Sequence, residues 1–477
     1  MLAYERLDFD SDQAIVGLMA KHLSELRTFP LFFYGQDYML GVQAWIAVPF
    51  FWLGGPTVAM LRAPLVVINC LVAVWLVRQI ARSTGSPWLA LAAVLPFAAA
   101  TPVFAANLLE TLGASVEPFL YVLLLWTLRR RPVAFGVMLA IGFLHREFTI
   151  FAVAGIGMAT YRETGRSQLA DLRWVTRAAL GFAAVWIAVD QLKRRINTMG
   201  PPGGAEATGP LILQLQTLLS RVVISPAMAV PKLRQAVTEV LPDLLGMRAV
   251  QPLRYNINAA VAVGTAVVGS LLAVAGAICL IRLAAYLLSR RGNTPRSATL
   301  PSPFCTYMAV IGVQALLAYS LSDAVDPRFP AILRYALLAV FLPIALVTAF
   351  FEVETRRTWR AVVAILLAAS AALNSRDSWR IIDEYRRTPM PSEHRILADD
   401  LVARRVEYGT ATYFDAYITD FFARERVVLH SRDKVRIAAY AALVDAHAGT
   451  AVRVVRQPCS IGRPVASAWC VVDPLRR

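Results

Sequence analysis

The sequence has few charged residues, and this scarcity excludes a soluble domain. Asp, Glu, Lys and Arg make up 17% of the 477 residues, whereas 57% are hydrophobic. Long uncharged runs recur through residue 375, and such runs are typical of helices that cross a bilayer. We therefore predict a polytopic membrane protein whose core is built inside the bilayer.

Acidic residues are scarcer than basic ones, so the formal net charge is +16. A basic chain can bind nucleic acid, but here the arginines cluster in short loops between apolar runs. That clustering is typical of membrane topology, because positively charged loops stay in the cytoplasm. We expect the lipid bilayer to be a partner of this chain and nucleic acid not to be one.

Cysteine is scarce as well, with five in the whole chain. Cys70, Cys279 and Cys305 fall in apolar runs and are interpreted as small apolar residues. Cys459 and Cys470 lie near the carboxyl terminus, where an oxidising compartment would permit a disulfide.

The apolar runs predict about ten membrane-spanning helices, several of them short. A further run, Tyr38 to Leu53, is broken by Pro49 and is predicted to be an interfacial or re-entrant helix. The predicted fold is an all-α polytopic membrane domain of about 10 or 11 helices, followed by a carboxyl-terminal α/β domain. The predicted spans are residues 57–80, 87–106, 112–128, 132–146, 148–161, 174–190, 256–281, 304–321, 331–351 and 360–375.

Composition divides the chain into three predicted parts. Residues 1–56 are a first outer loop with amphipathic interfacial helices, and residues 57–375 are the membrane domain, with a long outer loop at 191–255. Residues 376–477 alternate helical patterns with β-rich runs, which indicates a small α/β domain. The helical patterns cover 393–407, 415–423 and 435–447, and the β-rich runs cover 410–413, 426–430, 451–456 and 468–472.

Arginine bias predicts the orientation, because every second loop is basic. The opposite set of loops, which includes both ends of the chain, is then extracytoplasmic. There is no signal peptide, and nothing before Asp8 can cross a membrane, so we expect a native first helix to be missing upstream. The alternative is that the amino terminus is translocated as a short tail. The predicted outer segments are 1–56, 107–111, 145–147, 191–255, 322–330 and everything after 375.

Acids at alternate positions precede a run with helical spacing near the start of the chain. Asp8, Asp10 and Asp12 lie just before an amphipathic helix that is predicted to begin near Asp12. Asp12 would face the positive end of the helix dipole, with Asp10 opposing a second charge, so one of the pair is a candidate base. A calcium-binding loop is excluded, because Gln13 and Met19 replace the required Gly and Glu. The alternative is a solvated acidic turn that caps the helix.

Further candidates lie where predicted spans meet the outer face. Glu117 enters an apolar run beside Pro118, and a carboxylate entering a membrane is usually functional, although an acid in a first helical turn is also common. His145, Arg146 and Glu147 lie between two short runs, where they contact substrate or form a self-paired turn.

Arg328, Arg334 and Tyr335 are a second group of candidates. Arg334 lies inside an apolar run, and arginine at a membrane edge requires an anion. A bidentate phosphate would satisfy it, and so would a structural partner such as Asp326.

Several stretches resemble the type C glycosyltransferases, which take sugars from polyprenyl-phosphate donors. Residues 9–20 and 29–39 are similar to the first outer loop of bacterial members, and Arg334-Tyr335 resembles a later motif. Residues 411–417 and 425–428 also resemble these proteins, so the similarity covers most of the chain. The wider group includes protein O-mannosyltransferases and lipid A aminoarabinose transferases.

The resemblance implies roles for two acids. In the group, an acid in the first outer loop acts as base or orients the acceptor, and by position that acid is Asp12. A second acid resembles Glu117, since Glu-Pro-Phe-Leu is similar to an Asp-x-Pro-Leu pattern in relatives. The aminoarabinose enzymes carry a basic residue in the first loop, whereas this chain has Gln36 and Asp37, so the phosphate is expected to be bound differently.

The predicted function is transfer of a sugar, with inversion, from a polyprenyl-phosphate donor to a glycolipid, polysaccharide or protein outside a bacterial plasma membrane. An acceptor hydroxyl needs a carboxylate and a lipid-phosphate leaving group needs positive charge. We expect no organic cofactor; a divalent cation on the acids is an alternative to arginine alone. A lipid-linked sugar flippase and an inactive scaffold are the rival functions, but the chain has no internal repeat typical of transporters. The expected roles are Asp12 as base, Asp10 as its support, Arg146, Arg328 and Arg334 on the phosphate, Tyr34 and Tyr38 on sugar faces, and Gln36, His145, Glu147 and Tyr335 lining the pocket.

Overall fold

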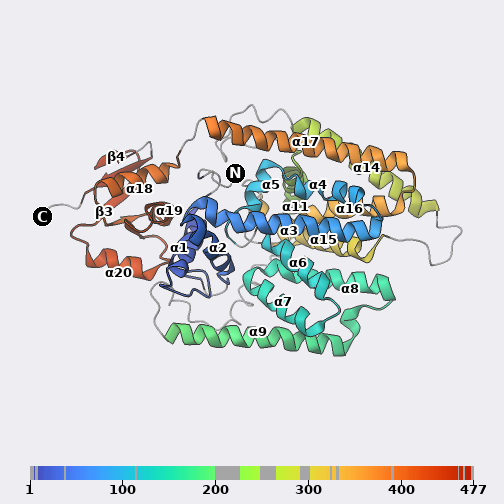
Figure 1. Cartoon of the computed structure of the whole chain (residues 1–477), viewed down its shortest axis with the longest axis horizontal. Helices are drawn as coiled ribbons and strands as arrows, with labels where there is room; N and C mark the ends of the chain where they lie inside the picture. Colours follow the sequence, from blue (N-terminus) through green and yellow to red (C-terminus); the bar gives the residue numbers. More distant parts are fainter. Residues whose placement is uncertain are drawn as a thin grey trace.

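Long apolar helices run side by side along most of the molecule, and a small sheet lies beyond one end of them (Figure 1). The computed structural model describes residues 5, 9–36, 39–112, 115–198, 226–247, 265–289, 301–322, 325–328, 332–387, 391–459, 461–465 and 468–473. Tyr38 and Asp37 lie outside these residues, as does the first part of the span predicted at 256–281.

Five helices in the described residues are long and apolar enough to cross a membrane, which makes the chain an integral multi-pass membrane protein. A sixth span would be the pair α4 (Pro87–Ala98) and α5 (Pro102–Leu108), which is bent by 81° between the two helices. The five are α3 (Val58–Thr84), α9 (Leu172–Thr198), α14 (Thr265–Ser289), α15 (Pro303–Leu321) and α17 (Arg357–Arg387).

The other predicted spans correspond to shorter helices. The run at 112–128 becomes helical only from Glu117, where Pro118 occupies the first turn, and the run at 331–351 opens with two 3₁₀ turns, η5 (Leu333–Tyr335) and η6 (Leu337–Val340). The helices are α6 (Glu117–Leu128), α7 (Pro132–His145), α8 (Phe151–Thr164) after η1 (Glu147–Ile150), and α16 (Phe341–Val353). The run predicted as an interfacial or re-entrant helix corresponds to α2 (Val42–Gly54).

The region predicted as a long outer loop contains helical structure. Helix α9 continues to Thr198, and α11 (Pro226–Gln235) leads through the π-helical turn η3 (Ala236–Val240) into α12 (Leu241–Leu245). The short 3₁₀ turn η2 (Gln168–Ala170) precedes α9.

The helix predicted near Asp12 is α1 (Ser11–Ser24), and Asp10 caps it. The expected exposed face is not there: residues Ser11 and Gln13–Leu23 are buried. The reason is that α2 packs on α1 from one side and α19 (Tyr413–Ala423) from another. At Gly17, α1 approaches α19 so closely that an added Cβ would lie 2.5 Å from the Phe421 ring.

The carboxyl-terminal α/β region is confirmed, with one strand that sequence reasoning missed. The parallel strands β1, β2 and β3 are joined through helices, as parallel strands require, and β4 is the missed strand, a short edge strand that contains Pro464. The five-stranded sheet has the order β2-β1-β3-β5-β4, with β5 antiparallel to β3 and β4. The elements are α18 (Glu393–Ala403), β1 (Tyr408–Ala411), α19, β2 (Val428–Ser431), α20 (Ala438–Ala446), β3 (Val452–Arg456), β4 (Arg463–Val465) and β5 (Trp469–Val472).

Cys459 and Cys470 form a disulfide that ties the segment after β3 to β5. Cys279 and Cys305 are buried thiols, and Cys70 is an exposed one on α3.

Two hydrophobic cores organise the described residues. One is built from helices of the membrane region, both long and short, between α3 and α17. The other joins α1, α2 and the segment between them to the α/β region, with Ile15, Leu18 and Phe33 packed among residues such as Tyr417 and Leu429. The start of the chain and its last hundred residues therefore share one core, at the ends of the long helices (Figure 1).

Candidate active site

The amino-terminal end of α1 holds two carboxylates in different environments. Asp10 caps the helix, and its Oδ1 accepts from the Gln13 amide at 2.9 Å. Asp12 lies in the first turn with its side chain 27% exposed, and its Oδ1 accepts a hydrogen bond from the Tyr413 hydroxyl. Asp10 therefore caps the helix end, and Asp12 has a partly exposed side chain that a substrate can reach.

Two residues of the α/β region hold Asp12. The Arg436 guanidinium is buried, with Nη2 3.9 Å from Asp12 Oδ1 and Nε 3.4 Å from the Tyr413 oxygen. Burial and the negative charge of Asp12 raise the pKa of Tyr413, so this hydroxyl stays protonated and donates. A base that is oriented by a hydrogen bond and a nearby cation is suited to proton transfer.

The loop after α1 completes this end of the site. Arg436 Nη1 donates to the Gly35 carbonyl at 2.8 Å, and the Gln36 amide faces the same guanidinium, with its oxygen 2.8 Å from Nη2 when oriented toward it. Tyr34 is buried, and its hydroxyl contacts Thr28 Oγ1 at 2.7 Å and His22 Nδ1 at 3.0 Å. Stacking of Tyr34 on a sugar stays a prediction, and so does the role of Tyr38.

Arg334 meets an acid that the sequence did not single out as its partner. Its Nη1 donates to Glu110 Oε1 at 3.4 Å, and its charge also interacts with that of Asp10. Gln13 Oε1 accepts from the Thr111 amide at 3.2 Å, which joins α1 to the same segment. The Tyr335 ring lies 5.3 Å from the Arg334 guanidinium carbon. The structure thus brings Arg334 to the Asp10 and Asp12 end of α1.

Glu117 is buried, and its two oxygens accept from Gln43 and from Ser115 Oγ. The charge of Arg146 acts on Glu117, while Arg146 Nη2 donates to the Leu112 carbonyl. These contacts suit a structural acid as well as a functional one.

The remaining candidates make contacts with other residues of their own regions. His145 is buried, with Nδ1 2.8 Å from the Tyr121 oxygen, and Glu147 begins η1. Arg328 is exposed and pairs with Asp326 at 2.7 Å. Asp326 is therefore the partner of Arg328, whereas Glu110 pairs with Arg334.

The described residues contain no group of three or more His, Cys, Asp or Glu side chains placed to hold a metal ion. Acids do gather near α1, since Asp10 and Glu110 both interact with Arg334. A divalent cation on the acids stays a prediction.

Sequence reasoning did not assign Glu110, Tyr413 or Arg436 to the site. Tyr413 lies in a stretch that was matched only as a resemblance, and Arg436 lies in a plain helical pattern. Their association with Asp12 crosses about 400 residues of chain, as the Tyr413 bond shows. No local spacing carries that information.

No protein-family model matches the chain, and no curated protein matches it. Solved structures do resemble it. ArnT from Cupriavidus metallidurans in the apo state is 12% identical, over 99% of this chain and 96% of that chain, with a TM-score of 0.46. The same protein bound to undecaprenyl phosphate gives 12% identity, 100% and 96% coverage, and a TM-score of 0.44.

A second similar protein is the archaeal oligosaccharyltransferase AglB from Archaeoglobus fulgidus, in complex with an inhibitory peptide and a dolichol-phosphate. It is 13% identical, over 95% of this chain and 66% of that chain, with a TM-score of 0.45. At these identities and TM-scores the similarity concerns the overall fold and says nothing about individual side chains.

Proposed function

We propose that this protein is a membrane glycosyltransferase that moves a sugar from a polyprenyl-phosphate donor to an extracytoplasmic acceptor, with inversion at the anomeric carbon. Asp12 is the base. The acceptor is a glycolipid, a polysaccharide or a protein. The polyprenyl tail is held among the spanning helices, and the reaction takes place at their ends.

The observation that carries the proposal is the partial exposure of the Asp12 carboxylate together with the contacts that orient it. Its carboxylate is partly exposed and is held by Tyr413 and Arg436, and the ion pair between Arg334 and Glu110 lies near the same end of α1. Accessible acid and arginine next to each other, at the ends of apolar helices, match what transfer from a lipid phosphate needs.

Arg334 supplies the positive charge for the leaving group. Its side chain is 29% exposed and its bond to Glu110 is long, at 3.4 Å, so a phosphate oxygen can take the place of the carboxylate. Apolar side chains, including Pro118, Phe151 and Leu338, lie around Arg334. Arginine binds phosphate through two parallel N–H donors, which makes it the suitable residue here.

The reaction is a single displacement. Asp12 accepts the proton of the acceptor hydroxyl while that oxygen forms a bond to the anomeric carbon. The bond from the anomeric carbon to the phosphate oxygen breaks on the opposite face, and the phosphate leaves with the electron pair. Arg334 stabilises the charge that develops on the phosphate.

Two observations support an extracytoplasmic site. Alternate loops are rich in arginine, which supports an outer position for the Asp12 segment, and the α/β region carries the Cys459–Cys470 disulfide, a bond that persists in oxidising compartments. We assign the protein to a bacterial plasma membrane, with residues 1–56 and 376–477 as outer parts around the 57–375 membrane domain.

The test is release of labelled sugar from a panel of polyprenyl-phosphate sugars by the purified full-length protein, with membrane extract as acceptor. Wild type should use one donor, and Asp12→Asn should lower turnover about 10²- to 10⁴-fold while donor binding is retained. Asp399→Asn, at an exposed acid of α18, is the matched control and should transfer normally.

Two outcomes count against the proposal. Transfer that survives in Asp12→Asn would remove Asp12 as base. Donor binding without transfer from any donor would favour a flippase of lipid-linked sugars, because such a protein moves the lipid and leaves the sugar bond intact.

A further inference from the structure

A cavity of about 730 Å³ lies at the opposite end of α1 from Asp12, between that helix and the α/β region. Nine residues of helix separate Asp12 from Lys21, which is about 14 Å at 1.5 Å per residue. The transfer reaction proposed above does not use this cavity. We call it the Glu425 pocket, after the carboxylate at its centre.

Basic side chains dominate the polar lining of the Glu425 pocket. The acids are Glu407 and Glu425, and Glu25, just outside the lining, also pairs with Lys21 at 2.9 Å. Four Lys or Arg side chains against two Glu side chains leave an excess of two positive charges in the lining, before His22 is counted. The basic lining residues are Lys21, His22, Arg27, Arg424 and Arg426.

The Glu425 carboxylate is already paired with basic side chains from α1 and from the loop after it. Its side chain is 9% exposed and is bound by Lys21 Nζ at 2.5 Å, His22 Nε2 at 2.8 Å and Arg27 Nη1 at 2.8 Å. The Tyr440 hydroxyl also donates to it at 2.8 Å. This carboxylate therefore holds the wall of the pocket in place and cannot neutralise further cations.

Arg424 and Arg426 are the cations left to bind a ligand. Both are exposed, and among the described residues the only side-chain hydrogen bond of the pair runs from Arg426 Nε to the Ala423 carbonyl at 3.2 Å. Arg424 and Glu425 have φ angles of +53° and +60°, which two consecutive non-glycine residues rarely adopt. Backbone strain of this kind is concentrated at functional sites. Here it lets Glu425 bind α1 while the neighbouring Arg424 stays exposed.

An exposed apolar surface adjoins the pocket. We call it the interfacial patch, and its members are between 46% and 84% exposed. Trp52 Nε1 donates to the Ser24 carbonyl at 3.0 Å and Trp45 Nε1 to the Pro30 carbonyl at 2.7 Å, so both rings are anchored through their polar edge. The interfacial patch consists of Leu26, Phe29, Trp45, Trp52 and Leu53.

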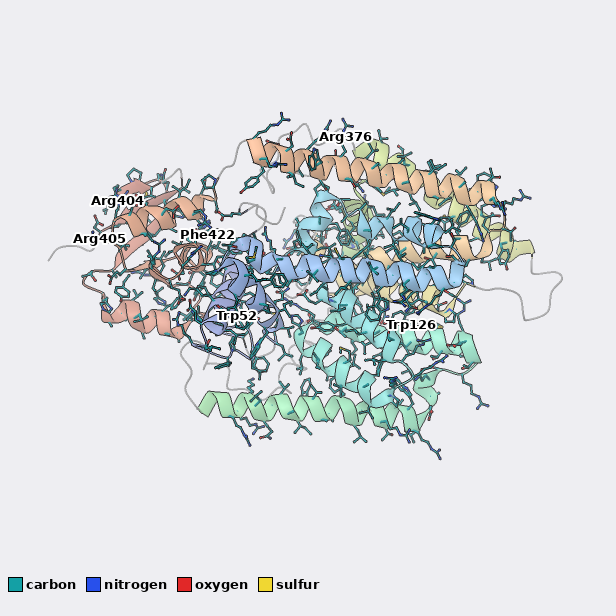
Figure 2. The ribbon with its side chains drawn as sticks, viewed as in Figure 1. Trp52, Trp126, Arg376, Arg404, Arg405 and Phe422 are labelled. Carbon is teal, nitrogen blue, oxygen red and sulfur yellow. A yellow bond between two sulfur atoms is a disulfide. The ribbon has the colours of Figure 1, made fainter. Side chains whose placement is uncertain are left out.

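The pocket and the patch share one stretch of backbone. Arg27 and Thr28 line the pocket, and Leu26 and Phe29, on either side of them, belong to the patch. The stretch joins α1 to α2, which lie at one end of the long helices, where Trp52 is also found (Figures 1 and 2). Tryptophan and basic residues at this level are typical of the membrane–water interface.

We propose that the Glu425 pocket binds the phosphate of an anionic phospholipid whose acyl chains lie against the interfacial patch. Arg424 and Arg426 bind the phosphate. The lipid seats the α/β region and α1 on the bilayer. This site is separate from the donor site and stands or falls independently of the transfer reaction.

The test is a titration of the delipidated full-length protein with phosphatidylglycerol or phosphatidylcholine, followed by native mass spectrometry. The wild-type protein should bind phosphatidylglycerol more tightly than phosphatidylcholine. Arg424→Gln/Arg426→Gln should weaken it about 30-fold, because each basic residue near an anionic lipid surface contributes about fivefold. Arg404→Gln/Arg453→Gln removes the same charge from exposed positions outside the pocket lining and should change nothing.

Two further variants separate the headgroup from the chains. Glu407→Gln removes an acid from the lining and should tighten phosphatidylglycerol binding. Phe29→Ser/Leu53→Ser should weaken both lipids alike, because the patch contacts chains and not phosphate. A melting temperature for each variant shows whether it is folded, and Arg424→Lys/Arg426→Lys, which keeps the charge, should retain most of the preference.

Three results would overturn the proposal. The first is equal binding of the two lipids by wild type. The second is a phosphatidylglycerol preference that survives in Arg424→Gln/Arg426→Gln, since the lipid would then lie elsewhere. The third is glycerol 3-phosphate binding as tightly as phosphatidylglycerol, which would make the pocket a site for a free phosphate ester and not for a lipid.

Discussion

The carboxylates at the two ends of α1 differ in their exposure and in the number of their partners. At the amino-terminal end, Asp12 is 27% exposed and has one hydrogen bond from Tyr413 and one guanidinium 3.9 Å away. At the carboxyl-terminal end, Glu425 is 9% exposed and is bound by Lys21, His22, Arg27 and Tyr440. Both contacts join α1 to the α/β region. A saturated carboxylate serves as an anchor, whereas one that keeps open oxygen surface can exchange partners with a substrate.

The largest effect we expect is the loss of sugar transfer when Asp12, at the amino-terminal end of α1, is substituted. Asp12→Asn should lower sugar transfer about 10²- to 10⁴-fold, since it removes the base, and should leave the melting temperature within about 2 °C of wild type because the side chain is partly exposed. Transfer assays and a thermal melt on one preparation measure both. A melting temperature that falls along with activity would show that Asp12 is an anchor too.

Glu425→Gln should lower the stability of the fold and leave sugar transfer nearly unchanged. Removing one partner of a buried ion pair costs about 3 kcal/mol or more, because the partners stay buried and unpaired. We expect a marked fall in the denaturation midpoint, while transfer per folded molecule changes little. Glu384→Gln, an acid of α17 that does not line the pocket, is the control. An unchanged midpoint would mean that the anchor contributes nothing.

Low pH should weaken the ion pairs of Glu425, because its carboxylate becomes protonated. Burial alone would raise the pKa of Glu425, but hydrogen bonds from His22, Lys21 and Arg27 outweigh it and hold the pKa well below the ordinary 4.5. A depressed carboxyl pKa stabilises the fold above pH 4.5, and this stability is lost as pH falls below 4.5 toward the folded pKa. Denaturation midpoints from pH 6 downward should therefore fall more steeply for wild type than for Glu425→Gln. Parallel pH profiles for the two proteins would contradict this.

The smallest expected effect concerns the orientation of Asp12. Tyr413→Phe removes one hydrogen bond to the carboxylate, which corresponds to about 1 kcal/mol or about fivefold in rate. We expect kcat to fall while KM is kept, because the base is displaced and the donor contacts are not. Tyr408→Phe, in the same region but away from Asp12, is the matched control. A change in KM alone would assign Tyr413 to substrate binding.

Much of the membrane region could be predicted from the sequence, because a helix in a bilayer satisfies its own backbone and so depends on local composition. The helix after Asp10 and the α/β region beyond residue 375 were predicted for the same local reasons of capping and alternating pattern. The bend between α4 and α5 and the late start of α6 were missed, because they depend on how proline-containing segments pack. The edge strand β4 was missed because it is short and contains Pro464.

The sequence by itself determined that the chain spans a membrane, that an acid-capped helix begins it and that an α/β region ends it, since each rests on the spacing of neighbouring residues. Only the tertiary structure decided that α1 is buried on nearly every side, that Tyr413 and Arg436 hold Asp12, and that Glu425 anchors Lys21 and His22. Those contacts join residues about 400 positions apart. They exist because two distant segments share one hydrophobic core, and the pairing of such segments is a property of packing that no local pattern records.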